Sequence, residues 1–193
     1  MGGPGRIRIE YTTCALTGTT NPPASTSTTL GPVAAASTPA LVNLPTLTIS
    51  AVGGSTAPAN PAGTYATVDM TLPLATTNPV TVTLSATNIP VGTIFTVKVL
   101  PESGAEIPFT STPSMGTFAN STATVTINLP YGRTSLLFAY ASYTQVAGLF
   151  PLINGEPVEQ VLVAAQYGEA SMVTLITQSG KVIPAESLLT RGQ

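Results

Sequence analysis

The residues with the most chemical capacity in this chain form two close pairs. Glu102 and Glu106 lie four positions apart, and two neighbouring carboxyl groups are the acid–base pair of many glycoside hydrolases. Ser179 and Lys181 are separated by one glycine, and a lysine beside a serine can activate the hydroxyl as a nucleophile. Both pairs lie in turn-forming segments, Ser-Gly-Ala and Ser-Gly-Lys, so the sequence favours solvated hairpin turns over catalytic sites.

Lys98 suggests a different chemistry, an intramolecular isopeptide bond to an asparagine side chain. Asn78, Asn88 and Asn128 are the candidate partners. Such a bond requires lysine, asparagine and a carboxylic acid buried together, because the amine must lose its charge before it can attack. The alternation of the segment around Lys98 places its side chain on the solvent side of a strand, together with Thr96. The pattern therefore favours an ordinary surface lysine.

The residue types that the chain contains exclude several classes of functional site. The 193-residue chain has no histidine and no tryptophan, Cys14 is its one cysteine, and Asp69 is its one aspartate. Ser-His-Asp and Cys-His catalysis, ordinary catalytic zinc sites, internal disulfides and most dense calcium sites are thereby excluded. We expect a protein that is not an enzyme and that has no metal ion or other cofactor. Cys14 is expected to be a buried structural cysteine, with an intermolecular disulfide as the alternative.

Charge is scarce and dispersed. Charged residues make up 7% of the chain, against about 25% in an ordinary soluble domain, and the net charge is −2. The six basic residues form no patch in sequence, which argues against nucleic-acid binding. The nearest candidate for a membrane span, 136–147, is interrupted by polar residues, so no membrane span is predicted. So weakly charged a surface favours a chain that is packed in an assembly or coated with sugar.

Candidate glycosylation sites occur in two places. Asn120 begins the one acceptor sequon, Asn-Ser-Thr. Residues 17–38 consist mostly of Thr, Ser, Pro, Ala and Gly, a composition typical of O-glycosylated segments. The candidate acceptors there include Thr19, Thr20, Thr26 and Thr28.

Three tyrosines are candidates for an aromatic carbohydrate platform. They are Tyr131, Tyr140 and Tyr143. The period of two along a strand points Tyr140 and Tyr143 to opposite faces. Packing in the core is therefore favoured over a shared platform.

Short strands must position all of these residues. Thr and Val, which suit a pleated surface, alternate in several segments, while Pro and Gly mark the turns between them. Strands are predicted over 44–52, 65–72, 79–87, 93–100, 107–112, 122–129 and 134–144. Phe95, Val97 and Val99 are predicted to face the core. The spacing of about 8–20 residues predicts an all-β fold in which 44–145 form an immunoglobulin-like antiparallel β-sandwich.

Two smaller elements flank this predicted sandwich. Residues 1–16 are predicted to form an arm in which Ile7, Ile9 and Tyr11 lie on one face of a strand, followed by a Thr/Pro-rich linker, 17–43. The arm is predicted either to pair with a free strand edge of a neighbouring copy or to fold back onto its own C-terminal hairpin. Residues 146–193 are predicted to be a small β-meander, docked on or completing the sandwich, with strands at 158–167 and 171–178 and a short helical turn at 186–190.

Several motifs resemble those of one group of proteins. Gly-Arg-Ile-Arg-Ile-Glu at 5–10 is followed by the Pro/Thr-rich linker and then by Asn-Pro-Val-Thr-Val at 78–82 and Asn-Ile-Pro-Val-Gly-Thr at 88–93. This order, which covers roughly 6–144, resembles the C-terminal part of long exported bacterial surface proteins. In those proteins the end rung of a glycine-rich region precedes a linker and an immunoglobulin-like domain. The resemblance implies an extracellular or cell-surface location and a structural role, without an enzymatic activity.

These observations favour one function over two alternatives. The leading hypothesis is a non-enzymatic structural module of an extracellular bacterial surface or fibre assembly, self-assembling by strand addition. Its partners would be copies of itself or other surface-assembly subunits, and glycans are further candidates. The alternatives are a carbohydrate- or surface-binding adhesin domain, and a viral or phage coat or decoration protein. The amino-terminal Met-Gly-Gly-Pro-Gly contains no signal peptide, which suggests a piece of a longer or processed chain.

Overall fold

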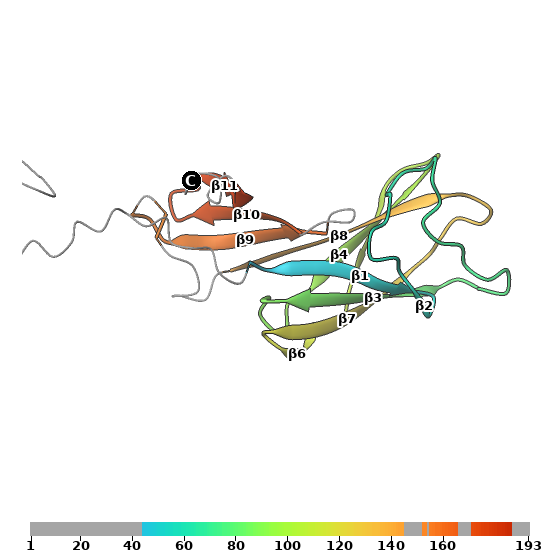
Figure 1. The fold of residues 1–193 in the computed structure, drawn as a ribbon, viewed down its shortest axis with the longest axis horizontal. Coiled ribbons are helices and arrows are strands. Elements are labelled where there is room, and N and C mark those ends of the chain that lie inside the picture. Colours follow the sequence, from blue (N-terminus) through green and yellow to red (C-terminus); the bar gives the residue numbers. More distant parts are fainter. Residues whose placement is uncertain (1–43, 145–151, 154, 166–170, 187–193) are drawn as a thin grey trace, which may run out of the picture. The chain divides into compact units, whose positions relative to one another are not determined.

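A computed structural model describes residues 44–144, 152–153, 155–165 and 171–186 (Figure 1). The predicted arm and linker, and with them Cys14, lie outside the described residues, as does most of the helical turn predicted at 186–190. All eleven regular elements of the described part are β-strands, arranged in two antiparallel sheets. The prediction of an all-β chain built as a sandwich is confirmed for this part.

Each sheet draws its strands from distant parts of the chain. Sheet A has the spatial order β2 (Ser55–Thr56), β1 (Thr46–Val52), β3 (Val80–Thr87), β7 (Asn120–Ile127) and β6 (Met115–Thr117). Sheet B has the order β11 (Val182–Pro184), β10 (Met172–Thr177), β9 (Val158–Ala164), β8 (Ser135–Thr144), β4 (Phe95–Pro101) and β5 (Ile107–Thr110).

The core lies between the two sheets and follows the alternation in the sequence. In β4 the side chains of Phe95, Val97 and Val99 are fully buried, as predicted, whereas Thr96 and Lys98 on the other face are partly exposed. The same alternation occurs in β3 and β7, where every second residue is buried. Because successive side chains of a strand point to opposite faces, one face of each of these strands packs and the other meets solvent.

The strand predicted at 65–72 is wrong, because this segment lies within a long irregular loop between β2 and β3. The carboxylate of Asp69 accepts hydrogen bonds from the backbone N–H groups of Ala62 (2.5 Å) and Gly63 (2.9 Å). The hydroxyl of Tyr65 donates to the Leu100 carbonyl at 3.0 Å. In this loop, side chains therefore form hydrogen bonds that a strand would form with the backbone of a neighbouring strand. The prolines along 58–79 also reduce the number of backbone N–H donors. Strands β2 and β6 were not predicted, because each is too short for its alternation to be recognised.

The strands after residue 152 extend sheet B. Strand β8 pairs with β4 along most of its length, and its C-terminal half also pairs with β9, from Tyr140 opposite Ala164 to Thr144 opposite Gln160. Strands β10 and β11 follow β9 as successive antiparallel neighbours. Of the two arrangements considered for this segment, the strands complete the sandwich and do not form a separate layer. Val161, Val163 and Leu175 belong to the same core as β3 and β4.

Candidate functional site

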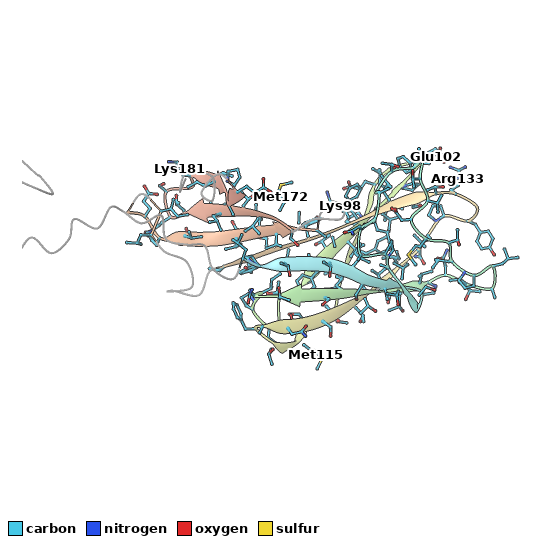
Figure 2. All side chains as sticks on the ribbon, in the orientation of Figure 1. Lys98, Glu102, Met115, Arg133, Met172 and Lys181 are labelled. Atoms are coloured by element: carbon cyan, nitrogen blue, oxygen red, sulfur yellow. The ribbon has the colours of Figure 1, made fainter. Side chains whose placement is uncertain are left out.

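The two glutamates considered for catalysis have different surroundings. The Glu106 carboxylate forms an ion pair with the Lys98 ammonium, with an Oε1–Nζ distance of 2.7 Å. The backbone N–H of Glu102 donates to the Thr134 carbonyl at 3.0 Å, and both glutamate residues are exposed. Lys98 lies within β4, whereas Glu102 directly follows the end of that strand (Figure 2). An exposed carboxylate held by a lysine on the outer face of a sheet is an ordinary surface ion pair.

Ser179 and Lys181 form a hairpin turn, as predicted. The Ser179 hydroxyl donates to the Glu156 carboxylate at 2.6 Å, and the backbone N–H of Lys181 donates to the Thr177 hydroxyl at 3.2 Å. Hydrogen bonds from Ser179 and Thr177 lower the pKa of Glu156 below its usual value. The Ser179 hydroxyl therefore donates to a carboxylate whose lowered pKa makes it a weak proton acceptor, which favours a structural hydrogen bond of the turn over activation of a nucleophile.

Lys98 lacks the environment that an isopeptide bond requires. Its ammonium hydrogen-bonds to Glu106, which raises the lysine pKa above 10.5, and lies 5.3 Å from the centre of the Tyr140 ring. The Asn78 side chain forms two hydrogen bonds with the backbone of Leu129, and the Asn88 amide donates to the Leu44 carbonyl. A charged, partly exposed lysine cannot attack an amide, so this arrangement supports the surface role predicted for Lys98.

The Glu106→Gln variant is expected to lower the pKa of Lys98 toward 10.5, because the neutral amide removes the carboxylate that holds the proton. In the wild type, folding raises the lysine pKa, so the ion pair contributes stability below pH 10.5 that is lost as the pH rises through the folded-state pKa. An NMR titration of the Lys98 side-chain signals measures both values. An unchanged lysine pKa in the variant would contradict the ion pair.

The remaining predicted residues do not converge on one site. Tyr140 lies on the outer face of sheet B beside Lys98, whereas Tyr143 packs against the core, and its burial raises its hydroxyl pKa. Tyr131 is 79% exposed in the loop before β8. Asn120, the first residue of β7, is exposed. The other candidate residues, Ile7, Ile9, Tyr11, Thr19, Thr20, Thr26 and Thr28, lie outside the described residues.

The outermost strands of sheet A, β2 and β6, are short, and beyond them β1 and β7 each have a backbone position that is paired with a residue from another part of the chain. At β1, the buried Ser171 hydroxyl accepts a hydrogen bond from the Leu47 N–H (2.7 Å) and donates to the Leu47 carbonyl (2.9 Å). At β7, Thr112 donates its N–H to the Thr124 carbonyl (2.8 Å) and accepts the Thr124 N–H on its hydroxyl (3.2 Å). The backbone groups that an added strand would use at these positions are therefore already paired.

Each outermost strand of sheet B contains a proline. Directly after β5, the Ser111 N–H donates to the Phe95 carbonyl of β4, and the Phe95 N–H donates to the Ser111 hydroxyl. By the alternation of an antiparallel ladder, the nitrogen of Pro108 therefore faces away from β4. The bonds from Ala185 to Val173 and from Thr177 to Lys181 place the Pro184 nitrogen of β11 on the outer side in the same way. A proline in this position removes the donor that a further strand would need.

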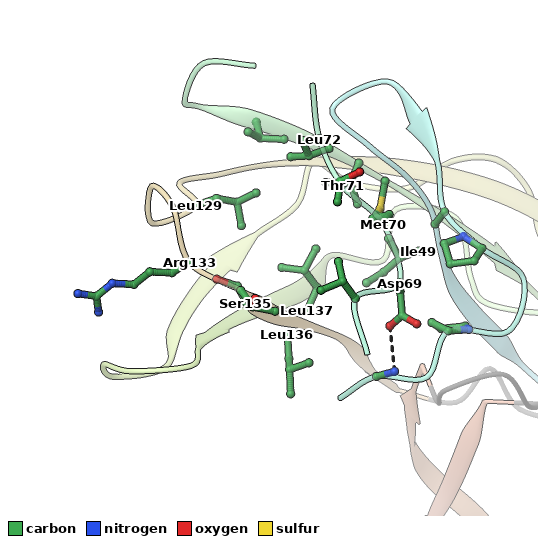
Figure 3. Close-up of a pocket in the computed structure, with 18 of the residues that line it drawn as sticks. Ile49, Asp69, Met70, Thr71, Leu72, Leu129, Arg133, Ser135, Leu136 and Leu137 are labelled. Carbon is green, nitrogen blue, oxygen red and sulfur yellow. Dashed lines mark hydrogen bonds between the residues drawn. The ribbon is translucent and has the colours of Figure 1, made fainter. Parts of the chain in front are cut away.

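An apolar groove of about 620 Å³ lies where the long loop after β2 meets one end of the sandwich (Figure 3). Its walls come from β1, from the loop and from the connection between β7 and β8. The apolar lining includes Ile49, Val52, Met70, Leu72, Leu129 and Leu137. This volume lies within the range of about 300–1,000 Å³ that is usual for ligand pockets.

Apolar side chains also gather at the rim of this groove. Leu74 is 92% exposed, Tyr131 79% and Val68 54%, and all three line the groove. Its charged lining residues are Asp69 and Arg133, and Arg133 hydrogen-bonds to Ser103 and points away from the other labelled residues (Figure 3). The groove is thus apolar with one carboxylate at its wall. Sequence reasoning missed it, because its lining residues come from segments between 48 and 165.

Comparison of the chain with protein-family models, curated proteins and solved structures gives no match. Among the described residues, no three His, Cys, Asp or Glu side chains are grouped so that they could hold a metal ion. No helix in that part of the chain is long and apolar enough to cross a membrane.

Proposed function

We propose that this chain is a non-enzymatic structural module of an extracellular bacterial surface or fibre assembly, built on an immunoglobulin-like sandwich. The strand order supports the finer fold assignment. In spatial order, β1, β3, β7 and β6 correspond to strands A, B, E and D of an immunoglobulin sheet, and β9, β8, β4 and β5 correspond to G, F, C and C′. Strands β10 and β11 would then be additions beyond strand G.

The observation that carries the proposal is that positions along the edges of both sheets are blocked for further strand pairing. In sheet A, Ser171 and Thr112 occupy backbone groups of Leu47 in β1 and Thr124 in β7, and Pro108 and Pro184 lie in the outermost strands of sheet B. Exposed edges pair indiscriminately when domains are crowded. A sandwich with blunted edges is suited to dense packing beside its own copies, where contacts must be limited to chosen surfaces.

The blocked edge positions also affect how copies of the chain could join. Strand addition requires a row of free backbone N–H and C=O groups on the acceptor, and at Leu47, Thr124, Pro108 and Pro184 this row is interrupted. We therefore propose that the arm, residues 1–16, joins copies through its apolar side chains, Ile7, Ile9 and Tyr11, and not through an edge of the described sheets.

Removal of residues 1–20 is expected to abolish assembly and to leave the melting temperature nearly unchanged. Negative-stain microscopy and sedimentation velocity, applied to the full chain and to the shortened chain, measure assembly, and circular dichroism measures melting. A full chain that stays monomeric at every concentration would contradict the assembly function. A shortened chain that still polymerises would leave the function standing and exclude the arm. Closed shells would favour a coat protein, and monomers that bind a glycan array would favour an adhesin.

A further inference from the structure

We infer that the apolar groove beneath the loop after β2 is a self-association surface, at which two copies of the chain meet about a two-fold axis. In this contact Leu74 of each copy enters the groove of the other. The inference rests on the proposed function, in which copies of the chain pack together, and it adds the surface of the described sandwich that they use. A two-fold contact closes on itself as a dimer, so growth beyond the dimer requires a different contact.

The groove and a projecting apolar side chain lie on the same face of the molecule. Leu74 is a central residue of a turn that is closed by a hydrogen bond from the Thr76 N–H to the Pro73 carbonyl (2.8 Å), and it is 92% exposed. All three residues of this turn line the groove. A surface that carries both a projection and a hollow is complementary to itself, which is the requirement for a two-fold contact.

The rim of the groove favours a second copy over a small molecule as the occupant. Tyr131 and Val68 line the groove beside Leu74 and are more than half exposed, and an exposed apolar surface beside a hollow usually marks an interaction site. A small molecule inside the hollow would leave Leu74 and Tyr131 in water, whereas a second copy covers the rim together with the hollow. Aromatic and apolar side chains with few charges are typical of the centre of an interface between identical chains.

The charges of this surface are also complementary to themselves. Asp69 and Arg133 are the charged residues that line the groove, both are exposed, and neither forms an ion pair within the described part of the chain. Asp69 accepts hydrogen bonds from the Ala62 and Gly63 N–H groups and keeps further lone pairs. Arg133 donates to Ser103 through Nη1 and keeps the donors of its other nitrogens. A two-fold axis that places Asp69 beside Arg133 of the second copy forms this pair twice.

Leu74→Ser tests the contact in the full chain. Because each dimer loses two buried leucine side chains, the dissociation constant of the dimer is expected to rise by about a hundred-fold or more, as measured by sedimentation velocity over a dilution series. The matched control is Leu152→Ser, which changes another exposed leucine outside the groove and should leave the dissociation constant unchanged. In dilute solution both variants should melt as the wild type does, since both side chains are exposed in the single copy.

Two further measurements examine the geometry of the contact. Asp69→Asn and Arg133→Gln should each weaken the dimer, and the double variant should weaken it no more than either single one, because all three remove the same pairs. In a mixture of ¹³C-methyl-labelled and unlabelled full chain, isotope-filtered nuclear Overhauser effects are expected between Leu74 of one copy and Leu129 or Leu137 of the other.

Three results would overturn the inference. The first is an equal effect of Leu74→Ser and Leu152→Ser on the dimer, and the second is the absence of any effect between copies at the groove methyl groups. The third is a full chain that forms no dimer while decanol shifts the groove signals, which would make the groove a site for small apolar molecules. Large assemblies that form in Leu74→Ser as readily as in the wild type would overturn the groove contact and leave the proposed function standing. Dimers that require Leu74 and never grow further would support the groove contact and contradict the assembly function.

Discussion

The Phe95→Ala variant is expected to lose about 3–5 kcal/mol of its free energy of unfolding. Phe95 is among the largest fully buried side chains and lies at the start of β4, between β5 and β8. Removal of its ring forfeits the transfer free energy of the buried atoms and leaves a cavity that the two sheets can close only in part. Because a domain is usually stable by about 5–15 kcal/mol, this single change removes a large share of the total. Urea denaturation followed by circular dichroism measures the loss.

Thr96→Ala is the matched control, because Thr96 is the next residue of β4 and faces outward. It should change the free energy of unfolding by no more than about 0.5 kcal/mol. If Phe95→Ala fails to fold, Phe95→Leu retains most of the buried volume and should give a smaller, measurable loss. A loss below about 1 kcal/mol in Phe95→Ala would mean that the core does not lie where the structure places it.

Ser171→Ala is expected to cost about 2–4 kcal/mol, an effect out of proportion to the single oxygen atom that is removed. The Ser171 hydroxyl is the partner of both the N–H and the carbonyl of Leu47, and both residues are buried. Each buried backbone group that loses its partner costs about 1–3 kcal/mol. The same variant should accelerate hydrogen exchange of the Leu47 amide, because that N–H would have no acceptor.

Ser142→Ala is the control for this substitution. The Ser142 hydroxyl accepts a hydrogen bond from Gln160 at 2.6 Å, but on the exposed face of sheet B, where water replaces it. Its free energy of unfolding should therefore stay within about 0.5 kcal/mol of the wild type. Equal effects of the two alanine variants would show that Ser171 does not close the edge of β1.

For the long strands, the sequence alone predicted which face is buried and which is exposed. Val82 and Leu84 are fully buried and alternate with partly or fully exposed threonines, because a strand between a core and solvent requires that pattern. The segment 65–72 was misassigned, because its residue types suit a strand. Its conformation is instead determined by hydrogen bonds from Ala62 and Gly63 to the Asp69 side chain, which no periodicity reveals.

The features on which the proposals depend were harder to predict. Ser171 and Leu47 are 124 positions apart, and nothing in the composition around Ser171 distinguishes it from the many other serines. The prolines of β5 and β11 were visible in the sequence, but whether their nitrogens face outward depends on the ladder alternation. The groove depends on the path of an irregular loop, which residue types alone do not specify.

The continuity of sheet B has a consequence for how such a protein can evolve. Strand β9 pairs with β8 across the boundary predicted between 145 and 146, so the last three strands share a ladder and a core with the earlier ones. A gene duplication or exchange that ended at residue 145 would transmit only half of sheet B and leave β8 paired with β4 alone. The smallest piece of the described chain that recombination could move intact is therefore the whole of 44–186.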